Sequence, residues 1–230
     1  MKQFITEGIV LSRTDFGEAD RIITVITPDY GKLRLIAKGV RKIKSKLAGG
    51  IELFSVSNIS FIKGRGEIDT LISTRLIQHY KHITSDLQRV QLGYELIKLL
   101  NSVTEDNVGI EYFDLLKTMI QTLDKLNVDI DLIRTWYYAQ LLKLSGHSPN
   151  LLSDASGHKL QTGQSFSFNL NNGTLIPQNN GNLTTQHVKL LRLIFSHNRP
   201  WVLQQVNDMP QLLTKCTPIV QAMLNTFVRV

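Results

Sequence analysis

The pattern of apolar and polar residues changes near residue 81. Before that point, short segments rich in Ile, Val, Leu, Thr and Phe are separated by turn residues such as Gly49-Gly50. This pattern predicts five β-strands, over residues 4–12, 21–27, 32–37, 53–62 and 67–77. In the third strand, apolar residues at 33, 35 and 37 alternate with Lys32, Arg34, Ile36 and Lys38, so one face is apolar and the other mostly cationic, as a half-buried strand requires. Five short strands predict a small closed barrel.

Beyond residue 81 the apolar residues follow helical spacing. It predicts helices near residues 87–100, 113–123, 130–144, 188–195 and 210–227, and Ser85 with Gln88 resembles a capping box at the first of them. Residues 147–182 are rich in Gly, Ser, Asn and Gln, and a short hairpin is predicted around Asn171-Asn172-Gly173. The predicted fold class is therefore α+β. A five-stranded OB-fold barrel over residues 1–81 precedes a helical domain over 82–230 that contains the 147–182 insert.

Positive charge is concentrated in the predicted barrel. Residues 1–81 contain 14 Lys and Arg against 8 Asp and Glu, a net of +6, whereas residues 82–230 contain 12 against 11, a net of +1. Five of these cations lie within residues 38–46, without any carboxylate among them. Such a cluster repels itself unless a polyanion offsets it, and a phosphate backbone is the commonest polyanion. The plainer alternative is that the charge serves solubility alone.

Candidate nucleic-acid contacts follow from this cluster and from the strands and turns beside it. Lys32 and Arg34 lie on the polar face of the third strand, which is either a solvated outer face or a continuation of the basic loop. Phe16 and Tyr30 occupy turns and either stack on bases or plug the barrel ends. The predicted cationic contacts are Lys32, Arg34, Lys38, Arg41, Lys42, Lys44, Lys46, Lys63 and Arg65.

Several classes of chemistry lack their sequence signatures. The chain has no Walker phosphate loop and no H-E-x-x-H, and its nearest approach to G-x-S-x-G, residues 146–150, ends in Asn150. The single cysteine, Cys216, excludes an internal disulfide and a cysteine-cluster metal site. No run of 18 apolar residues and no signal-peptide core occurs. We therefore expect a cytoplasmic protein with no catalytic residue, no cofactor, no bound metal and no membrane contact.

The motifs together resemble the bacterial RecO family of DNA-repair mediators. The resemblance rests on residues 16–20 (FGEAD), on residues 36–41 (IAKGVR) followed by further cations, on residues 63–71 (KGRGEIDTL) and on residues 144–151 (LSGHSPNL). It implies a non-enzymatic, nucleoid-associated protein of the RecF pathway that binds single- and double-stranded DNA and anneals strands. It also implies RecR, single-stranded-DNA-binding protein and RecA as partners.

The sequence departs from the family pattern in the insert. Many members carry two C-x-x-C steps that hold a structural zinc, but here Ser153 and Ser156 replace the first pair, and residues 176–179 contain no thiol. Neutral oxygen ligands are poor substitutes for thiolates at zinc, so a zinc-ribbon-like insert without metal is expected. Two other functions remain open from the residues alone. One is an RNA-binding OB-fold protein, and the other is a protein-interaction scaffold.

Overall fold

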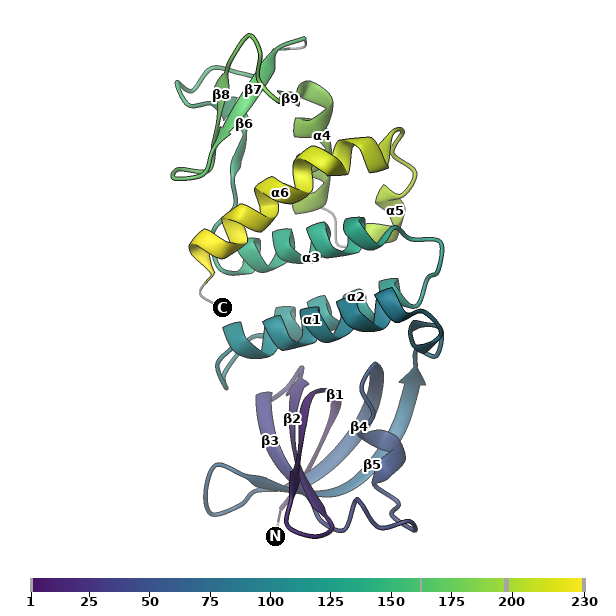
Figure 1. Cartoon of the computed structure of the whole chain (residues 1–230). Coiled ribbons are helices and arrows are strands. Elements are labelled where there is room, and N and C mark those ends of the chain that lie inside the picture. Colours follow the sequence, from purple (N-terminus) through teal and green to yellow (C-terminus); the bar gives the residue numbers. More distant parts are fainter. Residues whose placement is uncertain (1, 162, 197–198, 229–230) are drawn as a thin grey trace. The chain divides into compact units, whose positions relative to one another are not determined.

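The computed structural model describes residues 2–161, 163–196 and 199–228. The chain forms two compact units, Met1–Lys125 and Leu126–Val230. The first contains the β-barrel together with two helices that follow it, and the second contains the remaining helices and a small sheet (Figure 1). The mixed α+β class predicted from the sequence is confirmed. The domain division predicted at residues 81 and 82 stays a prediction.

The barrel is closed, with its strands in the order β1-β2-β3-β5-β4. Its neighbours pair antiparallel except for β3 and β5, which run parallel and pair through Leu35 with Asp69 and Ile36 with Thr70. Leu33, Leu35 and Ala37 are buried as their alternation predicts, and they belong to one barrel core with the other inward side chains. The strands are β1 Gln3–Phe16, β2 Asp20–Thr27, β3 Gly31–Ala37, β4 Ser55–Ile62 and β5 Asp69–His79.

Two helices, α1 (Leu87–Val103) and α2 (Ile110–Leu123), complete the first unit after the 3-10 turn η2 (Ile83–Ser85). The predicted capping box at Ser85 is wrong, because the side chain of Asp86 accepts hydrogen bonds from the backbone N–H groups of Gln88 and Arg89. The hydroxyl of Ser85 donates instead to the carbonyl of His82 at 2.7 Å. A carboxylate at this position also interacts favourably with the positive end of the helix dipole.

The second unit joins four helices to a small sheet. The sheet has the order β6-β8-β7-β9, and its central hairpin pairs Asn169 with Thr174, which confirms the predicted turn over residues 170–173. Phe166 is fully buried, whereas Phe168 is half-buried. The elements are α3 Ile130–Leu144, β6 Asn150–Asp154, β7 Ser165–Asn169, β8 Thr174–Pro177, β9 Leu183–Thr184, α4 Thr185–Ser196, α5 Pro200–Leu203 and α6 Met209–Phe227. None of the helices in the described ranges is both long and apolar enough to cross a membrane.

Candidate nucleic-acid interface

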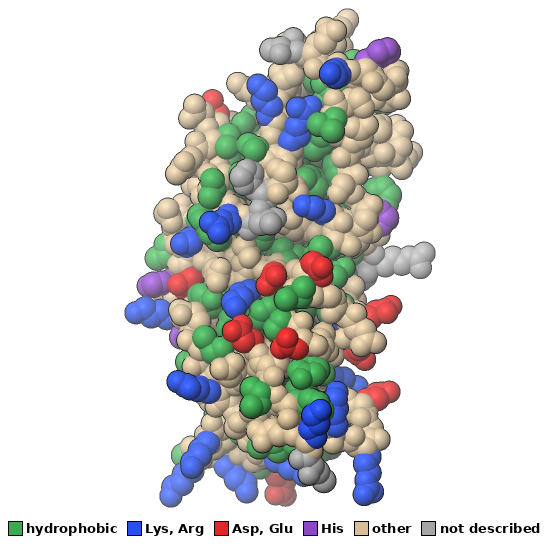
Figure 2. All heavy atoms as spheres, turned by 180° about the vertical axis from the view of Figure 1, so that it is seen from behind, with side chains coloured by type: hydrophobic (Ala, Val, Ile, Leu, Met, Phe, Trp, Pro, Cys, Tyr) green, Lys and Arg blue, Asp and Glu red, His purple; other side chains and the backbone are tan. Residues whose placement is uncertain are grey.

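Three connections of the barrel carry most of the candidate contacts. They are the β1–β2 turn (residues 17–19), the β3–β4 connector (residues 38–54) and the β4–β5 loop (residues 63–68). The β1–β2 turn, the β4–β5 loop and the first part of the connector lie at the end of the barrel away from α1 and α2 (Figure 1), whereas Phe54, the last residue of the connector, packs against α1. Lys and Arg side chains project around this end (Figure 2). OB-folds bind oligonucleotides with the face of strands 2 and 3 and with the 1–2 and 4–5 loops. Arg34 on β3 and Lys63 and Arg65 on the β4–β5 loop lie on these elements, whereas the cations of residues 38–46 lie on the β3–β4 connector.

The start of the β3–β4 connector is fixed to the β1–β2 turn. Gly39 has a φ of 64°, in the left-handed region that favours glycine, and its N–H donates to the Asp20 carboxylate at 2.7 Å. The N–H of Arg41 donates to the carbonyl of Ala19 at 3.0 Å. These bonds hold the first cations of the connector beside the turn that contains Phe16-Gly17.

Five of the predicted cations carry charge that nothing nearby offsets. Their side chains lie in exposed residues of the connector and of the β4–β5 loop, and the structure records no ion pair for them among the residues it describes. Ile43, in the middle of this segment, is also fully exposed. This arrangement keeps positive charge available to a polyanion in solution. The five are Lys38, Lys42, Lys44, Lys46 and Arg65.

Three other predicted cations form ion pairs within the barrel end. Lys63 lies 3.0 Å from the buried carboxylate of Asp69, and the N–H of Gly64 donates to the same carboxylate. Arg34 lies 3.8 Å from the exposed Glu67, a distance at which the pair contributes little. Arg41 pairs with Asp15 at 3.4 Å. Of these three, Arg34 is the most readily available to a ligand.

Lys32 has a structural partner that the sequence did not indicate. Its Nζ donates to the carbonyls of Asn101 and Thr104 at 2.9 and 2.8 Å, at the carboxyl end of α1. Partial burial lowers the pKa of Lys32, and the carboxylate of Asp106 opposes that shift. A cation at this end of a helix satisfies terminal carbonyls and interacts favourably with the helix dipole. We therefore leave Lys32 out of the interface proposed below.

The separate role of Lys32 leads to a prediction. Lys32→Met removes two hydrogen bonds to helix-end carbonyls, so we expect it to lower the free energy of unfolding by about 1–3 kcal/mol. The salt dependence of nucleic-acid binding should not change, because this ammonium group faces α1. Lys42→Met is the matched control, and it should reduce the salt dependence without affecting the urea midpoint. If the Lys32→Met protein instead had normal stability and weakened nucleic-acid binding, Lys32 would be a contact of the interface.

The two candidate aromatic residues differ in their surroundings. Phe16 is 52% exposed at the end of β1, so its ring is accessible to a base. Tyr30 packs edge-on against Phe4 and Phe61, with ring centroids 5.8 and 5.5 Å apart. This packing agrees with the alternative that Tyr30 plugs one end of the barrel. Stacking by Phe16 stays a prediction.

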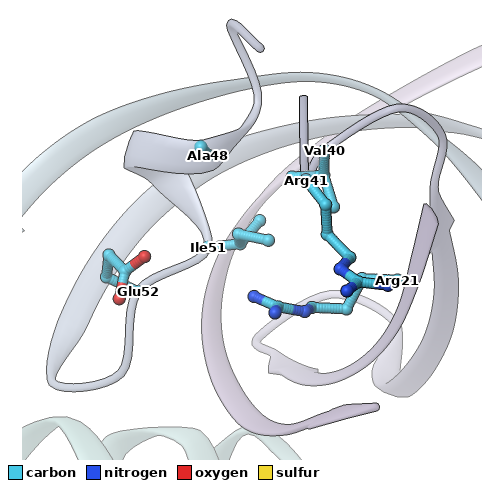
Figure 3. A pocket seen from close by; sticks show the side chains of 6 residues that line it. All are labelled: Arg21, Val40, Arg41, Ala48, Ile51 and Glu52. Atoms are coloured by element: carbon cyan, nitrogen blue, oxygen red, sulfur yellow. The ribbon is translucent and has the colours of Figure 1, made fainter. Parts of the chain in front are cut away.

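Sequence reasoning missed the arginines on the strands beside these loops. Arg21, at the start of β2, donates from Nε to the Asp15 carboxylate at 2.8 Å, and Arg13 on β1 pairs with Glu52 at 2.8 Å. Arg21 also lines a pocket with Arg41 and Glu52 (Figure 3). The available signal was the turn at residues 16–19, which brings residues 15 and 21 opposite each other across a hairpin.

The small sheet of the second unit does not offer a zinc site. The turn that corresponds to the first expected thiol pair is held by Asp154, whose carboxylate accepts the N–H groups of Ser156 and His158, both at 2.9 Å. Within the described residues, no group of three or more His, Cys, Asp or Glu side chains is placed to hold a metal ion. The residues present do not fit zinc, and the likeness of this sheet to a zinc ribbon stays a prediction.

Models of known protein families match both the barrel region and the helical region of the chain. The model described as Recombination protein O N terminal matches residues 1–80, and that described as Recombination protein O C terminal matches residues 84–215. A DNA repair protein RecO of Dehalococcoides mccartyi is 32% identical over 216 residues, which cover 91% of this chain and 81% of the relative. The chain belongs to the RecO family.

Further RecO relatives are similarly distant in sequence. That of Alkaliphilus metalliredigens is 31% identical over 172 residues, or 74% of this chain and 69% of the relative. That of Trichodesmium erythraeum is 34% identical over 147 residues, or 64% of this chain and 50% of the relative. Both are named DNA repair protein RecO. RecO membership confirms the resemblance inferred from the motifs and assigns the chain to DNA repair and recombination.

Proposed function

We propose that this protein is a non-enzymatic mediator of recombinational DNA repair that binds DNA through its barrel and anneals complementary strands. The observation that carries the proposal is a set of five exposed cations on the β3–β4 connector and the β4–β5 loop of a closed barrel, for which no ion pair is recorded among the described residues. Phosphate contacts by Lys and Arg release condensed counterions and carry no sequence information. Such a surface therefore binds each of two complementary strands, whatever their sequence. RecO membership supports DNA as the polyanion.

Annealing requires less of the protein than catalysis does. Two complementary strands repel each other through their phosphates, and a protein that neutralises part of this charge on both strands lowers the barrier to pairing. No covalent bond is made or broken, so no nucleotide hydrolysis or metal chemistry is needed. The proposal includes RecR, single-stranded-DNA-binding protein and RecA as partners, and RecO membership alone supports that part of it.

Annealing of complementary oligonucleotides coated with single-stranded-DNA-binding protein tests the function. We expect the full chain to accelerate pairing without ATP and with a chelator present, and moderate salt to suppress pairing in parallel with DNA affinity. Competition between DNA and RNA oligonucleotides of one sequence distinguishes the RNA-binding alternative. Preference for RNA, or a strict requirement for ATP, would contradict the proposal. Normal annealing after neutralisation of residues 42–46 would place the strand path elsewhere.

A further inference from the structure

A pocket of about 290 Å³ opens beside the β1–β2 turn. Its floor is rigid, because Val40 and Ile51 belong to the barrel core and are 5% and 1% exposed. The side chain of Arg21 extends toward Ile51, and that of Arg41 lies beside it (Figure 3). Glu52 lies on the other side of Ile51. The pocket therefore has a cationic wall above an apolar floor.

One carboxylate holds both guanidinium groups of that wall. Asp15 Oδ1 lies 2.8 Å from both Nε and Nη2 of Arg21, and Asp15 Oδ2 lies 3.4 Å from Nε of Arg41. The hydrogen bond from Arg21 lowers the pKa of Asp15, with further lowering from the charges of Arg21, Arg41 and Arg13. The Asp15 side chain is nevertheless 50% exposed, so the bridge lies at the surface.

We propose that Arg21 and Arg41, which line this pocket, bind one phosphodiester group of a single strand, and that the phosphate displaces Asp15, which bridges the two guanidinium groups in the free protein. This inference rests on the DNA binding proposed above. Two guanidinium groups that converge on the two oxygens of a carboxylate can equally bind the two non-bridging oxygens of a phosphodiester. A phosphodiester carries the same single negative charge as the carboxylate. Because exposed ion pairs contribute little, Asp15 is readily displaced.

Arg41 is held by backbone contacts that do not involve Asp15. The N–H of Arg41 is bonded to Ala19, and its Nη1 donates to the carbonyl of Gly17 at 3.4 Å. Arg21 lies on β2 directly opposite Asp15 in the β1–β2 register, and the side-chain contacts recorded for it within the described residues are to Asp15. Glu52 is neutralised by Arg13. Removing the Asp15 charge should thus leave Arg41 in place and free the Arg21 guanidinium for an anion beside it.

An internal competitor suits a protein that must release its ligand. Each phosphate bound here first breaks an ion pair, so the strand is held less tightly than the count of cations suggests. A strand that has paired with its complement can then leave. Asp15 would in this way moderate affinity without reducing the rate at which charged loops attract DNA.

The test is a salt titration of binding to a fluorescent single-stranded oligonucleotide, measured by anisotropy with the full chain. We expect Asp15→Asn to bind about three- to tenfold tighter, with a slope of log affinity against log salt steeper by about 0.7. Glu18→Gln is the matched control, because Glu18 is an exposed carboxylate of the same turn for which no ion pair is recorded among the described residues. It changes net charge equally and should produce a smaller gain. In the Arg21→Gln background Asp15→Asn should produce a smaller gain than in the wild-type chain, because only Arg41 is then left for Asp15 to compete for.

The outcomes separate this inference from the function on which it rests. Weaker binding by Asp15→Asn would make Asp15 a positioning residue and overturn the displacement model, as would identical gains in Asp15→Asn and Glu18→Gln. In both cases DNA binding by the wild-type chain would stand. An absence of salt-dependent binding by all variants would instead contradict the proposed function itself. Asp15→Ser, which also removes the charge, repeats the test if Asp15→Asn fails to fold.

Discussion

Replacing Lys42, Lys44 and Lys46 together by glutamine should weaken binding of a single-stranded oligonucleotide by about 10- to 100-fold at roughly 0.1 M salt. These side chains are exposed and have no recorded ion pair within the described ranges, so each is available for one phosphate contact. At about 0.7 per contact on single strands, the slope of log affinity against log salt should flatten by about two. Anisotropy across a salt series measures both quantities.

A charge-matched control distinguishes contact from net charge. Arg75, Lys81 and Lys98 are exposed cations of the same unit, on β5, after it and on α1. Their joint replacement by glutamine lowers the net charge by the same three units but should change the slope much less. Equal losses in the two triple variants would mean that the protein attracts DNA through its overall charge rather than through the connector. Unfolding midpoints should be unchanged in both, because exposed charges contribute little to stability.

Sequence periodicity anticipated the barrel because its strands are amphipathic. Leu33, Leu35 and Ala37 alternate with residues of a mostly cationic face that also contains Ile36, and burial of the apolar face then requires the register that the structure shows. The turn at residues 170–173 was equally accessible, since its Asn-Asn-Gly sequence favours a hairpin. Both features are determined by residues close together in the sequence, and periodicity and turn motifs detect relations between such residues.

Features that depend on contacts distant in sequence were not accessible in this way. Lys32 lies on the same face of β3 as Arg34, two residues before it. Its ammonium group nevertheless donates hydrogen bonds to carbonyls about 70 residues further along the chain. For Arg21 the hairpin made the pairing with Asp15 predictable, but the contact of Asp15 with Arg41 on the β3–β4 connector depends on folding of the barrel end. The sequence therefore identified the candidate cations but could not distinguish a cation that bonds within the fold, such as Lys32, from those that face solvent.

The contact between Phe54 and α1 carries the largest expected effect on stability. Phe54 ends the β3–β4 connector, is 3% exposed and has a left-handed backbone with a φ of 57°. Its ring packs edge-on to Tyr94 at 5.5 Å and lies against Gly93. A non-glycine residue in this conformation is strained by roughly 1–2 kcal/mol, so burial of the ring must outweigh that strain. Phe54→Ala should lower the free energy of unfolding by about 3–5 kcal/mol.

Gly93→Ala is a sharper test of the same contact, because its effect on the free energy of unfolding should change sign when Phe54 is replaced by Ala. A Cβ at Gly93 would lie 2.4 Å from Phe54 Cε1 and 2.8 Å from Cζ, so Gly93→Ala forces a buried ring to move. Overpacking of this kind costs about 1–3 kcal/mol, which should exceed the gain of about 1 kcal/mol in helix propensity. In the Phe54→Ala background the clash is gone, and Gly93→Ala should then stabilise the protein by up to about 1 kcal/mol.

Urea unfolding of the four proteins in this cycle measures the coupling between the two positions. Phe16→Ala is the control for loss of an aromatic ring, since Phe16 is half exposed and its removal should change stability little. Gly49→Ala is the control for an added methyl group, because nothing lies within 4 Å of a Cβ at that position. Additive effects of Phe54→Ala and Gly93→Ala would show that the two side chains do not meet. A sign reversal would establish that the connector bearing the cations proposed to bind DNA is anchored to α1 through this ring.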